Sequence, residues 1–155
     1  TWRDLATPNG DTVRFVFSYG ISNWTNAVTA DRDSSRPQER FWKTTNVGGQ
    51  YQIPVFGDST WHDAWPQDYD EPIPLPWGFA GGNQGTTDEM NHFCIDRHNG
   101  WTNMLFMDWS VRHVGLKELW TLKWHRAFDT KNLWTKAGGC SPSDWPQWLR
   151  KYRDY

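Results

Sequence analysis

Two short apolar runs followed by a helical repeat constrain the fold of this chain more than any other feature. Residues 103–107 and 110–114 are rich in apolar and β-branched side chains, and only Asp108 and Trp109 lie between them. This pattern predicts a β-hairpin. From residue 116 the apolar side chains recur at helical spacing, with charged residues on the other side. Residues 91–130 therefore predict a hairpin that leads through Gly115 into an amphipathic helix over 115–129.

The same segment resembles a known family. His98 stands ten positions before Asp108 in RHNGWTNMLFMDWSVRHVGLKELW. This spacing resembles the H-X9-DG motif of bacterial prepilin-type proteins, which are relatives of type IV pilins and of the major pseudopilins of type II secretion. The similarity continues through LKELWTLKWHRAFDT, WTKAGG and SPSDWPQWLRKYRDY, and more weakly upstream through SYGISNW, IPVFGDSTW and WPQDYDEP. It covers most of the chain, and its specific part is the C-terminal half.

One position departs from the family motif. Trp109 stands where Gly follows Asp in the motif. Asp-Gly favours a type I′ turn because the second position needs a positive φ, which a Cβ makes costly. The sequence thus predicts either another turn type or a strained turn. A strand of about eight residues would separate His98 from Asp108 by more than about 20 Å. We therefore expect local structural roles for both, with His98 binding loop backbone and Asp108 binding turn amides.

The composition indicates one domain over residues 1–155 and no nucleic-acid partner. The net charge is −2, with Lys and Arg scattered among Asp and Glu, so no basic footprint exists. The thirteen Trp residues predict a polar-lined core, many exposed rings, or both, because each indole N–H needs a partner. Residues 1–12 are rich in turn formers and are interpreted as a linker edge.

We expect an α+β fold in which an antiparallel sheet of roughly four to six strands packs against the helix over 115–129. Residues 13–18 and 51–56 are further predicted strands, and Pro54 places the second at an edge or in a bulge. Residues 143–155 predict a short C-terminal helix and tail, which Ser143 or Asp144 would cap.

The family resemblance implies a longer precursor. It would carry a basic leader and a hydrophobic N-terminal helix that anchors in the membrane and later packs in a fibre core. Residues 1–155 contain no run of about 18 apolar residues, so we expect them to be a globular head. A head without its helix should expose an apolar groove, with residues 13–18, Leu116, Trp120 and Trp124 as candidates to line it.

A loop over residues 57–71 collects carboxylates and aromatic rings. Asp58, Asp63, Asp68 and Asp70 offer the oxygen ligands that Ca²⁺ prefers, although their spacing does not match an EF-hand. The alternative is a solvated acidic loop capped by aromatic side chains. The resemblance adds support for the metal without fixing its ligands, because pseudopilins of this family often bind Ca²⁺ in a C-terminal loop. No other cofactor is expected.

Two further features leave alternatives open. Trp61, Trp65, Tyr69 and Trp77 fall in loops, and they would bind carbohydrate if they formed a flat exposed strip. Cys94 and Cys140 are the only cysteines. In an exported protein they would form one disulfide across a loop of about 45 residues. The other possibility is that Cys94 is a buried free thiol.

No pattern in the chain indicates catalysis. The sequence has no H-E-x-x-H, no G-x-S-x-G and no C-x-x-C. We expect a structural subunit of a type IV pilus-like filament or a type II secretion pseudopilus, acting by assembly outside the cell or in the periplasm. Its partners would be copies of itself or other pilin-like subunits, and loops 30–38 and 57–85 would carry specificity. The alternative is a secreted carbohydrate-binding module that uses the loop aromatics.

Overall fold

The computed structural model describes residues 2–6, 12–16, 19–26, 36–74 and 88–155. Strands and short 3₁₀ helices follow one another along this part of the chain. In order they are β1 (Trp2–Ala6), β2 (Thr12–Val16), β3 (Tyr19–Ser22), η1 (Asn23–Thr25), η2 (Gln38–Arg40), η3 (Gln50–Gln52), β4 (Pro54–Asp58), β5 (Asp63–Ala64), η4 (Glu89–His92), β6 (Trp101–Phe106), β7 (Val111–Gly115), η5 (Lys117–Thr121) and η6 (Lys136–Gly138).

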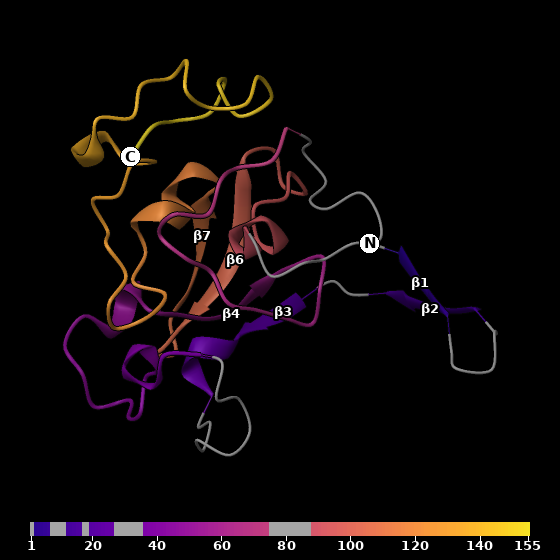
Figure 1. Ribbon diagram of the computed structural model, residues 1–155, viewed down its shortest axis with the longest axis vertical. Helices are drawn as coiled ribbons and strands as arrows, with labels where there is room; N and C mark the ends of the chain where they lie inside the picture. Colours follow the sequence, from indigo (N-terminus) through magenta and orange to yellow (C-terminus); the bar gives the residue numbers. More distant parts are fainter. Residues whose placement is uncertain (1, 7–11, 17–18, 27–35, 75–87) are drawn as a thin grey trace.

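A five-stranded sheet in the order β5-β3-β4-β6-β7 forms the centre of the fold (Figure 1). Its neighbours β3–β4, β4–β6 and β6–β7 are antiparallel, whereas β3 and β5 are parallel. The predicted number of strands is therefore confirmed, but the sheet is mixed rather than antiparallel, because β5 pairs with β3 in parallel. β1 and β2 pair in a separate two-stranded sheet. β2 overlaps the strand predicted over 13–18, and β1 lies in the region interpreted as a linker edge.

The predicted hairpin is confirmed as β6 and β7, but its turn is longer than predicted. The Phe106 N–H donates to the Ser110 carbonyl, and the Trp109 N–H donates to the Phe106 carbonyl, both at 2.9 Å. Met107, Asp108 and Trp109 thus form a three-residue loop, which is a type I turn followed by a left-handed residue. Trp109 is that residue, with φ 66°. The turn is both of another type and strained.

The β4 strand begins later than predicted and contains the expected irregularity. Residues 50–52 form η3, so only the end of the predicted 51–56 strand is extended. The register of β4 against β6 shifts between Pro54, which pairs with Phe106, and Phe56, which pairs with Leu105. Pro54 lies at a bulge, as its missing N–H predicted.

Both predicted helices are wrong. After η5 the backbone is already extended at Leu122, with φ −79° and ψ 153°. The Lys123 N–H then donates to the Gln52 carbonyl at 2.8 Å, so a tertiary hydrogen bond replaces the next helical one. Residues 143–155 form successive turns. The described residues therefore show a mixed sheet with 3₁₀ helices and turns rather than the predicted α+β fold. No helix among them is long and apolar enough to cross a membrane.

One face of the sheet carries the core. Met104, Phe106 and Val114 project from β6 and β7 into a cluster with apolar side chains of the C-terminal half. The prediction of an exposed groove at Leu116, Trp120 and Trp124 is wrong, because all three side chains are fully buried in this cluster. Leu119 and Phe128 belong to the same cluster. Of the predicted groove, the side chains of 13–18 lie outside those described.

The opposite face of the sheet exposes apolar side chains in register. Ile21 pairs with Phe56, Phe56 with Leu105, and Leu105 with Val111, so the four residues cross four strands on one face. We call these four residues the outer row. Phe56 and Val111 are exposed, and Tyr19 stacks on Phe56 with ring centroids 5.6 Å apart. The exposed apolar surface thus lies on the other side of the sheet from the predicted groove.

The strain at Trp109 can be measured with two substitutions that both remove the indole. Trp109→Gly should be more stable than Trp109→Ala by about 0.5–1 kcal/mol, because only Gly adopts a positive φ without a Cβ clash. Urea unfolding of both variants measures the difference. Equal stability would show that the left-handed conformation costs nothing here.

Candidate functional site

His98 and Asp108 of the resembling motif bind different partners at opposite ends of β6. The Nε2 atom of His98 lies 3.2 Å from Oδ2 of Asp58. The Oδ1 atom of Asp108 accepts from the Ser110 N–H at 3.0 Å and from its hydroxyl at 2.6 Å. The turn role predicted for Asp108 is therefore confirmed. His98 binds a carboxylate rather than the loop backbone.

Asp58 joins the end of β4 to β6 and to the loop before it. Its buried Oδ2 accepts from the backbone N–H of Asn103 at 2.8 Å and from the Asn103 side-chain amide at 2.9 Å. The Nη1 atom of Arg97 lies 3.9 Å from its Oδ1. This buried carboxylate is surrounded by donors, so its position is explained by the packing of β4 against β6.

The four carboxylates predicted to bind Ca²⁺ are held by separate parts of the fold. Asp63 accepts from the Asn23 amide at 2.9 Å, and Asp68 accepts from the Asp129 N–H at 3.0 Å. Asp58 and Asp70 bind other donors again. In the described ranges no three His, Cys, Asp or Glu side chains are grouped so that they could hold a metal ion. The Ca²⁺ site stays a prediction, without a cluster of these four residues.

Asp70 is the most perturbed carboxylate of this loop. Its buried Oδ2 accepts from the N–H groups of Gln67 and Met90 at 2.9 and 2.7 Å. Burial, with a smaller contribution from the nearby Asp88 and Glu89, raises the pKa of Asp70 to about 7 against the lowering effect of the two amides. The side chain therefore titrates near neutral pH.

The aromatic residues predicted to bind glycans lie in different structural environments. Trp65 packs edge-to-face against Trp24 and Phe41, with ring centroids 4.9 and 5.5 Å away. The Trp61 ring lies against His62, with centroids 4.9 Å apart. Tyr69 is exposed. Trp77 lies outside the described residues. Trp65 is thus part of the core packing, which leaves the predicted strip without one of its rings.

Cys94 and Cys140 are both free thiols in the structure. Cys94 is fully buried, and burial raises the pKa of its thiol far above the ordinary value. A protonated, inaccessible thiol is unreactive. For Cys94 the structure therefore shows the second of the two alternatives, a buried free thiol.

His125 is a buried side chain without hydrogen bonds. Neither of its ring nitrogens has a partner in the part of the chain that the structure describes. Its ring packs against Trp24 and Phe128, with centroids 4.9 and 5.3 Å away. Burial, together with the positive charges of Arg40 and Lys123, lowers the pKa of His125 to about 3. The imidazole is therefore neutral and serves as an aromatic core residue.

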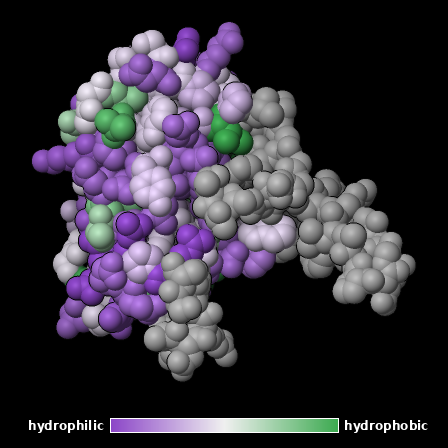
Figure 2. Space-filling model, in the orientation of Figure 1, coloured by the Kyte–Doolittle hydropathy of each residue, from purple (hydrophilic) through white to green (hydrophobic). Residues whose placement is uncertain are grey.

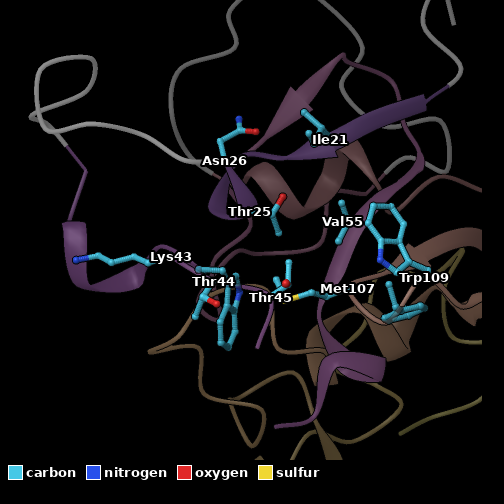
Figure 3. Close-up of a pocket in the computed structure, with 11 residues that line it drawn as sticks. Ile21, Thr25, Asn26, Lys43, Thr44, Thr45, Val55, Met107 and Trp109 are labelled. Atoms are coloured by element: carbon cyan, nitrogen blue, oxygen red, sulfur yellow. The ribbon is translucent and has the colours of Figure 1, made fainter. Parts of the chain in front are cut away.

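A cavity of about 320 Å³ lies where η1, residues 42–45, β4 and the β6–β7 turn meet (Figure 3). The indole N–H of Trp42 donates to the Trp124 carbonyl, and the hydroxyl of Thr25 donates to the Ser22 carbonyl. Their polar atoms are thus bound elsewhere, and the walls are mostly apolar. The lining consists of Ile21, Thr25, Asn26, Trp42, Lys43, Thr44, Thr45, Val55, Phe106, Met107 and Trp109. We call this cavity the Trp109 pocket.

No continuous stretch of sequence predicted this pocket, because its walls come from four separate segments. Only one residue in the sequence, Trp109, drew attention to this region. Trp109 occupies the position at which the motif has Gly, and its side chain is now one wall of the pocket with 77% of its surface exposed. Residues with a Cβ in the left-handed region are costly and cluster at functional sites. The Trp109 pocket is accordingly the strongest candidate site in the described residues.

Comparison with protein-family models, with curated proteins and with solved structures finds no match for this chain.

The neutral state of the buried His125 predicts how the free energy of unfolding depends on pH. Its folded pKa of about 3 lies below the ordinary 6.5, so the unfolded chain takes up a proton first as the pH falls. The contribution of the neutral His125 to the free energy of unfolding is complete above pH 6.5 and is lost as the pH falls toward 3. Between pH 7 and pH 5 the wild type should lose about 1–2 kcal/mol relative to His125→Phe, which keeps the ring contacts. Urea unfolding at both pH values measures this. An unaltered slope in His125→Phe would contradict the assignment.

The Ca²⁺ prediction can be tested at Asp70. A bound cation needs the ionised carboxylate, so it would favour ionisation of a group that otherwise titrates near pH 7. A Ca²⁺ site in this loop predicts that a chelator lowers the melting temperature and that Asp70→Asn abolishes the shift. Asp144→Asn, an exposed carboxylate outside the loop, serves as the matched control. No chelator effect beyond error would remove the metal hypothesis.

Proposed function

We propose that this chain is the globular head of a structural subunit in a type IV pilus-like filament or a type II secretion pseudopilus. It acts by assembly rather than by catalysis, outside the cell or in the periplasm. The resemblance around His98 and Asp108 supports this proposal. The largely antiparallel sheet, covered on one face by the C-terminal half of the chain, is compatible with it.

The outer row is the observation that carries the proposal. Single exposed apolar residues are normal on a protein surface, but a row that crosses four strands in register marks an interaction surface. On the face shown in Figure 2, hydrophobic residues form small separate spots among hydrophilic ones. An amphipathic helix buries its apolar stripe on such a row. We propose that the hydrophobic N-terminal helix of a longer precursor covers it and is the only part that enters the membrane.

The partners in this proposal are copies of the same subunit or other pilin-like subunits. The alternative, a secreted carbohydrate-binding module, rests on Trp61, Trp65, Tyr69 and Trp77 acting together. Since Trp65 packs in the core with Trp24 and Phe41, the structure gives this alternative less support.

The proposal predicts how the outer row behaves in the full-length protein in its native cell envelope. Phe56→Asp and Val111→Asp should leave the head folded, because both side chains are exposed, yet they should abolish assembly into filaments. Tyr51→Asp is the matched control, since Tyr51 is exposed on η3 and does not belong to the outer row. Circular dichroism checks folding, and electron microscopy with pelleting measures assembly.

The intact mass and the N-terminal sequence of the native protein give a second, independent test of the proposed function. The native protein should have an intact mass larger than that of residues 1–155 and an N-terminal sequence that begins with a methylated apolar helix. Normal assembly of Phe56→Asp, or a native chain that begins at Thr1, would contradict the proposed function.

A further inference from the structure

The volume of the Trp109 pocket is that of a site for a small molecule. Ligand pockets in proteins have volumes of about 300–1,000 Å³ and are lined mainly by apolar and aromatic side chains. At about 320 Å³ the Trp109 pocket lies at the lower end of this range. An apolar cavity of about 150 Å³ holds a benzene ring. The Trp109 pocket, about twice as large, therefore has room for a molecule of two fused rings.

The walls of the pocket suit an uncharged aromatic molecule. Trp42, Phe106 and Trp109 contribute rings, and Val55 contributes aliphatic surface. Aromatic partners gain from stacked or edge-to-face contacts with such rings. Lys43 is the only ionisable residue of the lining, and in Figure 3 its side chain extends away from the cavity, so it places no charge inside. A charged ligand would lose its hydration here without gaining a counter-charge.

The polar side chains of the lining define the ligand further. The Thr25 hydroxyl donates to the Ser22 carbonyl at 2.7 Å, and the Asn26 amide donates to the Asn23 Oδ1 at 2.7 Å. Both donor groups are thus engaged around η1. The Oδ1 atom of Asn26, by contrast, accepts no hydrogen bond from the described part of the chain. This wall therefore offers an acceptor, and a ligand that carries one donor can pair with it.

Trp109 is placed to cover one side of such a ligand. Its φ of 66° belongs to the left-handed region, where a residue with a Cβ is strained, and 77% of its surface is exposed. In Figure 3 Trp109 stands on one side of the cavity and Thr44 on the other. A ring bound beside the indole would remove from water the apolar surface that the free chain exposes. Ligand binding gives this strained and exposed side chain a function that neither the turn nor the core requires.

We propose that the Trp109 pocket binds an uncharged small molecule that has two aromatic rings and one hydrogen-bond donor. Its rings lie against Trp109 and Val55, and its donor binds the Oδ1 atom of Asn26. A sugar fits this site less well, because its many hydroxyl groups would lose water against mostly apolar walls. The site does not depend on filament assembly, so the inference goes beyond the proposed function.

Equilibrium dialysis of the full-length protein with radiolabelled indole tests the site. Indole is neutral, has two fused rings and carries one N–H donor. We expect saturable binding of one indole per chain, and 1-methylindole, which lacks the donor, should compete about three- to tenfold more weakly. Val55→Phe, which places a ring in the cavity, and Trp109→Gly, which removes a wall, should each weaken binding about tenfold or more. Val111→Phe, at an exposed position outside the pocket, is the matched control and should bind like the wild type.

The possible outcomes decide both the site and the class of ligand. The absence of saturable indole binding, or wild-type affinity in both Val55→Phe and Trp109→Gly, would overturn the site. Equal competition by 1-methylindole would overturn the donor to Asn26. Tighter binding of the anion indole-3-acetate, or of glucose, would overturn the uncharged aromatic class. Filament assembly by the same preparations is measured separately, so failure of the pocket and failure of the proposed function are distinguished.

Discussion

Hydrogen bonds from indole N–H groups to loop carbonyls hold this fold together. The indoles of Trp24, Trp120 and Trp148 donate to the carbonyls of Pro66, Asp70 and Ile73 at 2.9, 2.8 and 3.0 Å. All three acceptors lie in an irregular segment that has no strand partner, and backbone carbonyls removed from water need donors. The core rings thus fill the interior and also satisfy the loop that covers it. The same side chains therefore bury aromatic surface and provide hydrogen-bond donors for polar backbone groups.

The same bonds explain why a clear helical repeat does not form a helix. In an α-helix the Leu119 carbonyl would accept from the N–H of Lys123. Here it accepts from the Trp124 indole at 2.8 Å, and the Lys123 N–H donates to Gln52. The apolar repeat grouped Leu116, Trp120 and Trp124 together, and all three do belong to one core cluster, although none of them lines an exposed groove. Periodicity shows which side chains share a face, but it does not show which donors occupy the backbone carbonyls.

What the sequence predicted correctly is local. The β6–β7 hairpin follows from adjacent runs, and the bulge at Pro54 follows from a missing N–H. The order of the sheet and the Trp109 pocket depend on segments far apart in the chain, which no short pattern encodes. The carboxylates show the same limit, because adjacency in a loop does not decide the partner. Asp58 binds Asn103, which is 45 positions away. Trp109, which stands where the resembling motif has Gly, was the one local sign of the pocket.

The outer row and the Trp109 pocket share Ile21, which pairs with Phe56 on the sheet and also lines the cavity. The two features therefore adjoin at Ile21, and in the proposed subunit a helix on the outer row would lie beside the pocket. The strain at Trp109 costs about 1–2 kcal/mol in a free subunit. The turn itself holds this conformation, so a contact made by the exposed indole can offset the cost but does not relieve the strain.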